Sequence, residues 1–214
     1  MQDISDNHFR IENLSWEHQQ VIPLTTTGDC CEGMFGWDAF DGKVVEIDYE
    51  KNRMLVHTKR PKISKEYEKF DIEYMKEHFC IQVGVEADHK RYTGRFLFDL
   101  GYQRTVMLDH NMMQEKGLPI ADMPVIKESL VYNSRKEAIP LLTVAADKII
   151  FGKYVLDQVP AQVNSATRPA GYATNFLGGE ILKRFNIILD FQKHVVYLKP
   201  NHLFKEPYAE SKKS

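Results

Sequence analysis

GGEILKRFNIILDFQKHVVYLKP, residues 178–200, has a second copy earlier in the same chain. Residues 36–58 read GWDAFDGKVVEIDYEKNRMLVHT and align with it without a gap, at an offset of 142 residues. In each copy a glycine and a short helical stretch precede two β-branched or aromatic runs separated by turn residues, which predicts helix, strand, turn, strand. Two copies of one unit predict two related lobes, because a solenoid needs more repeats than this.

Four residues recur at equivalent positions of the repeat. Asp48 and Asp190 each follow an apolar strand residue and begin an Asp-aromatic-x-Lys segment, so we expect them to form hairpin turns or caps. Gly36 and Gly178 each follow apolar residues, and we interpret them as structural glycines at which strands cross.

The rest of the chain is dominated by alternating runs such as FCIQVGVE, residues 79–86, where Cys80 is expected to be a small packing residue. One short helix is predicted between Asp109 as N-cap and Gly117 as C-cap residue. SLVYNSRKEAIPLL, residues 129–142, is typical of a hairpin. The fold class predicted is mainly β with two or three short helices.

Composition excludes several classes of function. The 214 residues carry a formal net charge of −2, which gives no strong field for holding nucleic acid. No apolar run approaches the length of about 20 residues that spans a bilayer, so no membrane span is expected. The first residues, MQDISDNHFRIENL, are no signal peptide, and the compartment stays open, with export possible for a piece of a longer precursor. The three cysteines and eight histidines show no metal-ligand spacing, so no metal or cofactor is expected.

A second stretch, GRFLFDLGYQRTVML at residues 94–108, places an acidic residue directly after strand-type apolar residues. Carboxylates are rare in such positions unless something satisfies or uses them. Asp99 is also the only aspartate in the chain that is followed two residues later by glycine, here Gly101. The sequence alone allows Asp99 to be a catalytic carboxylate, the relic of one, or an ordinary turn residue.

FLFDLG, followed by NFLGGEILKRFNIILDFQKHVVYLKPN, resembles one lobe of the retropepsin-like and pepsin-like aspartic peptidases. The resemblance implies a complete acid-protease lobe over residues 78–201 and the closing half of a sister lobe over 1–61. Residues 62–77 would be a connector and strand, and 202–214 a mobile tail. We expect the D-x-G of the sister lobe to lie upstream of residue 1, and residues 9–58 to pack beside the complete lobe about a pseudo-twofold axis.

The resemblance also implies hydrolysis of a peptide bond by a water held between two aspartates, of which Asp99 would be one. Two close carboxylates share one proton, so one acts as base and the other as acid. Gly101 would allow the tight turn that presents Asp99 at the end of its strand, and Gly178 would pack close to that loop. Leu100 stands where the family has a hydroxyl that braces the loop, so we expect a loosely held loop, and Tyr102 replaces a small residue, where its ring would crowd the water.

Three hypotheses stay open for the function. Asp99 can complete an aspartic endopeptidase together with a missing N-terminal lobe, and the substrate is then a peptide or protein. The lobe can instead be a degenerate pseudopeptidase that binds extended peptides or a protein partner without cutting them. In the third hypothesis a second subunit supplies another Asp99. Because one carboxylate does half of the chemistry, the chain as given is expected to be inactive.

Overall fold

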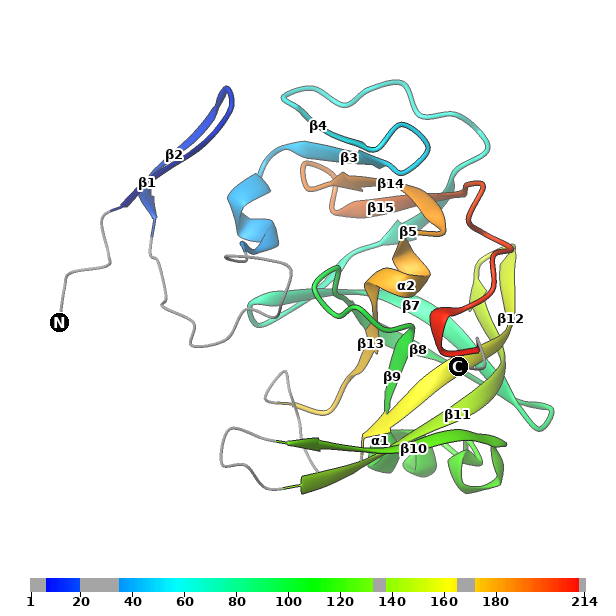
Figure 1. The fold of residues 1–214 in the computed structure, drawn as a ribbon. Helices are drawn as coiled ribbons and strands as arrows, with labels where there is room; N and C mark the ends of the chain where they lie inside the picture. The colour runs from blue at the N-terminus through cyan, green and yellow to red at the C-terminus, as the bar shows by residue number, and fades with distance from the viewer. Residues whose placement is uncertain (1–6, 20–34, 133–137, 165–171, 212–214) are drawn as a thin grey trace, which may run out of the picture. The chain divides into compact units, whose positions relative to one another are not determined.

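A computed structural model describes residues 7–19, 35–132, 138–164 and 172–211. The chain divides into two compact units, residues 1–41 and 42–214. The prediction of a mainly β fold with short helices is confirmed (Figure 1). No helix in these described ranges has both the length and the apolar character that a membrane crossing requires.

The first unit contains an antiparallel hairpin and one turn of 3-10 helix. Its aromatic side chains pack on one another, and the indole N–H of Trp16 donates to the carbonyl oxygen of Ala39. The Trp16 and Phe40 rings meet edge to face with centroids 6.0 Å apart, which anchors the 3-10 turn to the hairpin. The elements are β1 (Asn7–Ile11), β2 (Leu14–Gln19) and η1 (Trp37–Phe40).

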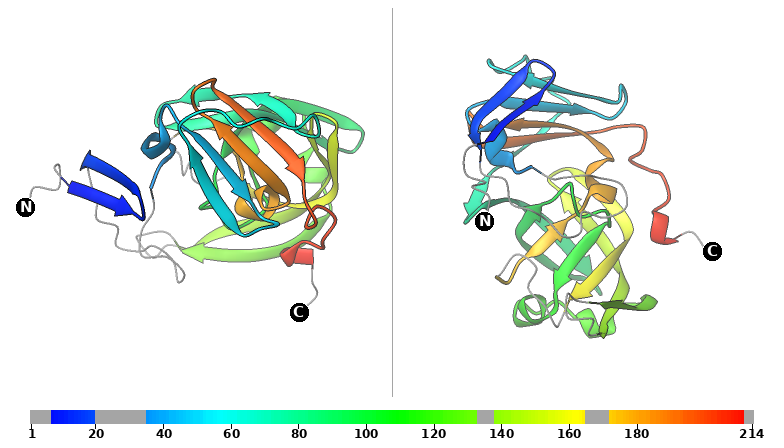
Figure 2. Two further views of the ribbon diagram at one scale, coloured as in Figure 1. Left: turned by 90° about the horizontal axis from the view of Figure 1, so that it is seen from above. Right: turned by 60° about the vertical axis from the view of Figure 1, so that its left-hand side comes forward.

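The second unit contains an eight-stranded sheet with the order β10-β11-β12-β9-β13-β8-β7-β6. An additional pairing between β11 and β7 bends this sheet back on itself, as the strands in Figure 2 show. Its strands are β6 (Glu73–Met75), β7 (His78–Ala87), β8 (Lys90–Phe98), β9 (Val106–Asp109), β10 (Val125–Tyr132), β11 (Ala138–Phe151), β12 (Tyr154–Asn164) and β13 (Asn175–Leu177).

A five-stranded sheet with the order β4-β3-β14-β15-β5 forms the other layer of this unit. Its central strand β14 is buried along its whole length, as expected for an apolar run covered on both faces. The strands are β3 (Val44–Asp48), β4 (Arg53–His57), β5 (Glu68–Asp71), β14 (Phe185–Asp190) and β15 (Val195–Pro200).

The two repeats form the same hairpin with the same register. Oδ1 of Asp48 accepts hydrogen bonds from the backbone N–H groups two and three residues later, and Oδ1 of Asp190 does the same. The equivalent turn residues Asn52 and His194 have positive φ values of 49° and 53°. The predicted equivalence of the two turns is therefore confirmed, and both aspartates are turn residues.

The two hairpins are related by a pseudo-twofold axis within the five-stranded sheet. β3 and β14 pair antiparallel, with Ile188 opposite Glu46, its own counterpart in the repeat. For residues 42–58 the expected packing about such an axis is confirmed. The part of that expectation that covers residues 9–41 belongs to the other unit.

Short helices connect the strands. The side chain of Asp109 caps α1 by accepting from the N–H of Met112, so the predicted N-cap is confirmed. The C-cap residue is Lys116, and the predicted Gly117 comes one position later, with φ of 78°. The predicted hairpin at 129–142 is formed by β10 and β11, with 133–137 outside the described residues. The helices are α1 (His110–Glu115), η2 (Ile120–Asp122), α2 (Gly179–Leu182) and η3 (Ala209–Ser211).

A buried arginine binds the segment that was expected to be a mobile tail. Arg184 is 1% exposed, and its Nη1 donates to the carbonyl oxygens of Leu203 at 2.9 Å and Glu206 at 2.6 Å. Its guanidinium carbon lies 4.2 Å from the ring centroid of Tyr208, which is itself buried. The tail is thus tied to the lobe as far as η3, because the buried arginine satisfies its donors with tail carbonyls.

Candidate active site around Asp99

Strand pairing brings Asp99 and Gly178 to one edge of the lobe. β13 lies between β8 and β9, parallel to β8, with Leu177 opposite Phe98 (Figure 1). Because parallel strands end at the same edge, the residues that follow them are neighbours. The backbone N–H of Asp99 donates to the carbonyl oxygen of Leu177 at 3.0 Å.

Gly178 packs directly against the loop of residues 99–105, here called the site loop. Its N–H donates to the carbonyl oxygen of Thr105 at 2.8 Å, and the N–H of Gly179 donates to that of Tyr102 at 2.6 Å. A Cβ at Gly178 would overlap the carbonyl oxygens of Arg104 and Tyr102. The predicted closeness of the D-x-G loop and Gly178 is therefore present, and only glycine fits at this position.

The Asp99 carboxylate is held by one of its two oxygens. Oδ1 accepts from the N–H of Gly101 at 2.9 Å and from the N–H of Tyr102 at 3.1 Å. No residue in the described part of the chain donates to Oδ2. The half-buried side chain is therefore oriented by backbone groups, while one oxygen stays open to a water, a proton or a ligand. Leu100 beside it is 41% exposed.

Tyr102 points into its own lobe. Its hydroxyl donates to Oε1 of the buried Gln162 on β12 at 2.5 Å, and its ring packs on Phe176 with centroids 6.2 Å apart. Burial raises the pKa of Tyr102 strongly, and the negative charges of Glu210 and Asp99 raise it further. The positive charge of Arg104 lowers it. The hydroxyl therefore remains protonated, and a hydrogen-bond donor, well above neutral pH.

The site loop is braced from within the lobe. Besides the Tyr102–Gln162 hydrogen bond, the hydroxyl of Thr105 donates to the carbonyl oxygen of Pro160. Nη1 of Arg104 lies 3.0 Å from Oε1 of Glu210. The expectation of a loosely held loop, drawn from the missing hydroxyl at Leu100, is therefore wrong, since these contacts hold the loop without it.

Replacing Tyr102 by Phe is expected to lower the free energy of unfolding by about 1–3 kcal/mol, because the buried acceptor on Gln162 loses its donor. Chemical denaturation of the two proteins measures this difference. Tyr74→Phe is the matched control, since the Tyr74 hydroxyl contacts His194 at an exposed position, and we expect a change within about 0.5 kcal/mol. If the Tyr102→Phe protein were as stable as the wild type, the Tyr102–Gln162 hydrogen bond would make no contribution to the free energy of unfolding.

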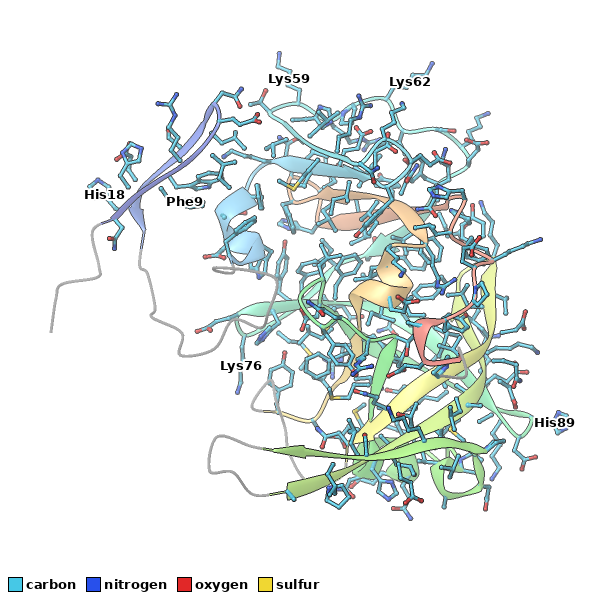
Figure 3. The ribbon with its side chains drawn as sticks, viewed as in Figure 1. Phe9, His18, Lys59, Lys62, Lys76 and His89 are labelled. Atoms are coloured by element: carbon cyan, nitrogen blue, oxygen red, sulfur yellow. The ribbon has the colours of Figure 1, made fainter. Side chains whose placement is uncertain are left out.

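The site loop and a cavity of about 700 Å³ lie at opposite ends of β8. The cavity is lined by the β7–β8 turn, including Asp88 and His89, and by residues of β11 and β12 such as Lys148. Figure 3 labels His89 at the tip of that turn. Because β8 separates His89 from Asp99, this cavity is no part of the candidate site. Within the described ranges, no group of acidic, His and Cys side chains is arranged to hold a metal.

The chain is similar to several solved structures, among them a bacterial protease and a plant globulin. A retropepsin-like aspartic protease from Rickettsia conorii is 18% identical, with 65% of this chain and 96% of that chain covered and a TM-score of 0.43. Basic 7S globulin from soybean is 8% identical, with 80% of this chain and 54% of that chain covered and a TM-score of 0.42. No protein-family model and no curated protein matches the sequence.

Sequence reasoning found the centre of this site and missed its supports. Asp99, Leu100, Gly101 and Gly178 lie together as the paired motifs predict. The supports, Gln162 and Glu210, are distant in sequence, and no local pattern marks either as a partner of the site loop. Gly36 is not brought against any loop of the described chain.

Proposed function

We propose that this lobe supplies one carboxylate, Asp99, of a two-aspartate peptidase site that hydrolyses peptide bonds in a peptide or protein substrate. The observation that carries the proposal is the carboxylate geometry: backbone N–H groups fix Oδ1, and Oδ2 is open. A catalytic carboxylate needs this combination of fixed orientation and one accessible oxygen.

The second carboxylate would come from a partner lobe or a second subunit. With two carboxylates close together, one proton is shared, because two adjacent negative charges are unfavourable. The charged member then accepts a proton from the attacking water, and the protonated member donates to the substrate oxygen on which charge develops. Asp99 is suited to either role.

The repeat supports the presence of a second loop. Gly36 has nearly the same backbone conformation as Gly178, with φ and ψ of −84° and 173° against −94° and 170°. Because Gly178 has no side chain, the site loop can approach its backbone closely. Among the described residues, a Cβ at Gly36 would meet the side chain of Asp38.

Binding without cleavage is the second candidate function. Leu100 exposes an apolar side chain next to Asp99, where the resemblance implies a small hydroxyl residue. An exposed apolar residue at the edge of a sheet suits contact with an extended peptide, whose main chain pairs with a strand. The same lobe would then recognise peptides as a pseudopeptidase.

We expect residues 1–214 alone to leave a denatured protein and a mixed peptide library intact between acidic and neutral pH. We expect the product of the whole reading frame, including any sequence upstream, to cleave both. A statine-type transition-state mimic should block this cleavage, because it occupies the place of the attacking water. Mass spectrometry of the products measures both results.

Cleavage by residues 1–214 alone, at a rate that rises with dimer concentration, would instead assign the second carboxylate to another copy of the chain. A whole product that binds peptides and never cuts them would favour the pseudopeptidase. A whole product that neither binds nor cuts would contradict the proposed function.

A further inference from the structure

Glu210 connects the end of the tail to the site loop. It lies on η3, and its Oε1 is 3.0 Å from Nη1 of Arg104. Arg104 belongs to the site loop, and its carbonyl oxygen accepts from the N–H of Glu180 on α2 at 3.2 Å. The tail therefore contacts the site loop at Arg104, whose backbone also contacts α2.

Burial disfavours the charged form of Glu210. Its side chain is only 12% exposed, and Oε2 is buried without a hydrogen-bond partner among the described residues. The ionisable groups that face it are Arg104 and Tyr102 from the site loop, Lys127 from β10 and Glu180 from α2. A buried carboxylate oxygen without a donor is costly, whereas the neutral acid avoids most of that cost.

We propose that Glu210 is a positioning residue, through which the tail docks on the site loop, and that this docking tightens when Glu210 takes up a proton. The proposal concerns the order of the loop and does not depend on whether the completed protein cuts peptides.

The direction of the pH dependence follows from linkage. Burial raises the pKa of Glu210. The positive charges of Arg104 and Lys127 lower this pKa, and the negative charge of Glu180 raises it further. In an undocked tail the carboxyl group is in water and has its ordinary pKa. The docked state therefore binds the proton more tightly, so docking is strongest below the ordinary pKa and weakens as the pH rises through the raised value.

Hydrogen exchange at two amides measures the docking. The N–H groups of Gly179 and Glu180 donate to carbonyl oxygens of the site loop. After correction for intrinsic exchange, we expect their protection to be higher at pH 4.5 than at pH 7.5, because the docked state binds the proton more tightly.

Two variants separate positioning from general stability. Glu210→Gln resembles the neutral acid, so we expect the pH dependence to disappear and protection at pH 7.5 to match that of the wild type at pH 4.5. Glu206→Gln is the control: it lies on the same tail with an exposed side chain and should behave as the wild type. Leu189 and Val196, paired across β14 and β15, report global stability.

The proposal would be overturned if Glu210→Gln kept the wild-type rise in protection. It would also be overturned if Gly179 and Glu180 changed in step with Leu189 and Val196, because the whole lobe would then be responding. A rise confined to Gly179 and Glu180 and lost in Glu210→Gln would support it, even if no peptide cleavage were ever observed.

Discussion

Asp99→Asn is expected to lower the rate of peptide cleavage by the whole gene product by about 10²–10⁴-fold, the range lost with a general acid or base. Asparagine has the same shape, and its Oδ1 can still accept from the N–H groups of Gly101 and Tyr102. The site loop should therefore keep its conformation. What the variant loses is the charge and the exchangeable proton, which the shared-proton chemistry requires.

The matched control is Asp71→Asn, at a side chain that is 81% exposed on β5. We expect its cleavage rate to equal that of the wild type within about twofold. Initial rates on one peptide, at pH values from acidic to neutral, give the comparison. An Asp99→Asn protein that cleaves as fast as Asp71→Asn would remove Asp99 from the chemistry and leave it as a turn residue.

Gly178→Ala is expected to lower the free energy of unfolding by about 3 kcal/mol, at the upper end of overpacking effects. The new Cβ meets the carbonyl oxygens of Arg104 and Tyr102, which are backbone atoms and cannot rotate away. Either the site loop or β13 has to move, and with it the hydrogen bonds from Gly178 and Gly179 to the loop.

Gly36→Ala provides an internal control, because its backbone conformation is nearly the same. Its Cβ meets the side chain of Asp38, which can rotate, so we expect a change within about 0.5 kcal/mol in residues 1–214. Denaturant titration of the two variants gives the difference. If both variants lowered the free energy of unfolding equally, the close approach of the site loop to Gly178 would not be the cause of the destabilisation.

Local patterns were sufficient for much of the fold. The repeat predicted both hairpins because strand alternation and the Asp-aromatic turns are encoded within a few residues of one another. The N-cap at Asp109 followed from a single residue for the same reason. Asp99 and Gly178 could be paired because the resemblance implies that the strand before D-x-G lies next to the strand that ends in apolar residues and glycine.

The remaining features depend on partners that are distant in the sequence. The tail lost apolar periodicity and was expected to be mobile, yet Arg184, about 20 residues earlier, binds its carbonyl groups. A lysine or arginine in a helical stretch gives no sign that it will be buried. Tyr102 likewise depends on Gln162, 60 residues later, so its brace to the site loop could not be read from the motif.

The antiparallel pairing of β3 with β14 has a consequence for the making of the protein. Glu46 leaves the ribosome 142 residues before its partner Ile188. At synthesis rates of about 5–20 residues per second, the first hairpin waits roughly 7–30 s with one edge unpaired. An open strand edge can pair with another nascent chain, so during this interval the hairpin is exposed to aggregation.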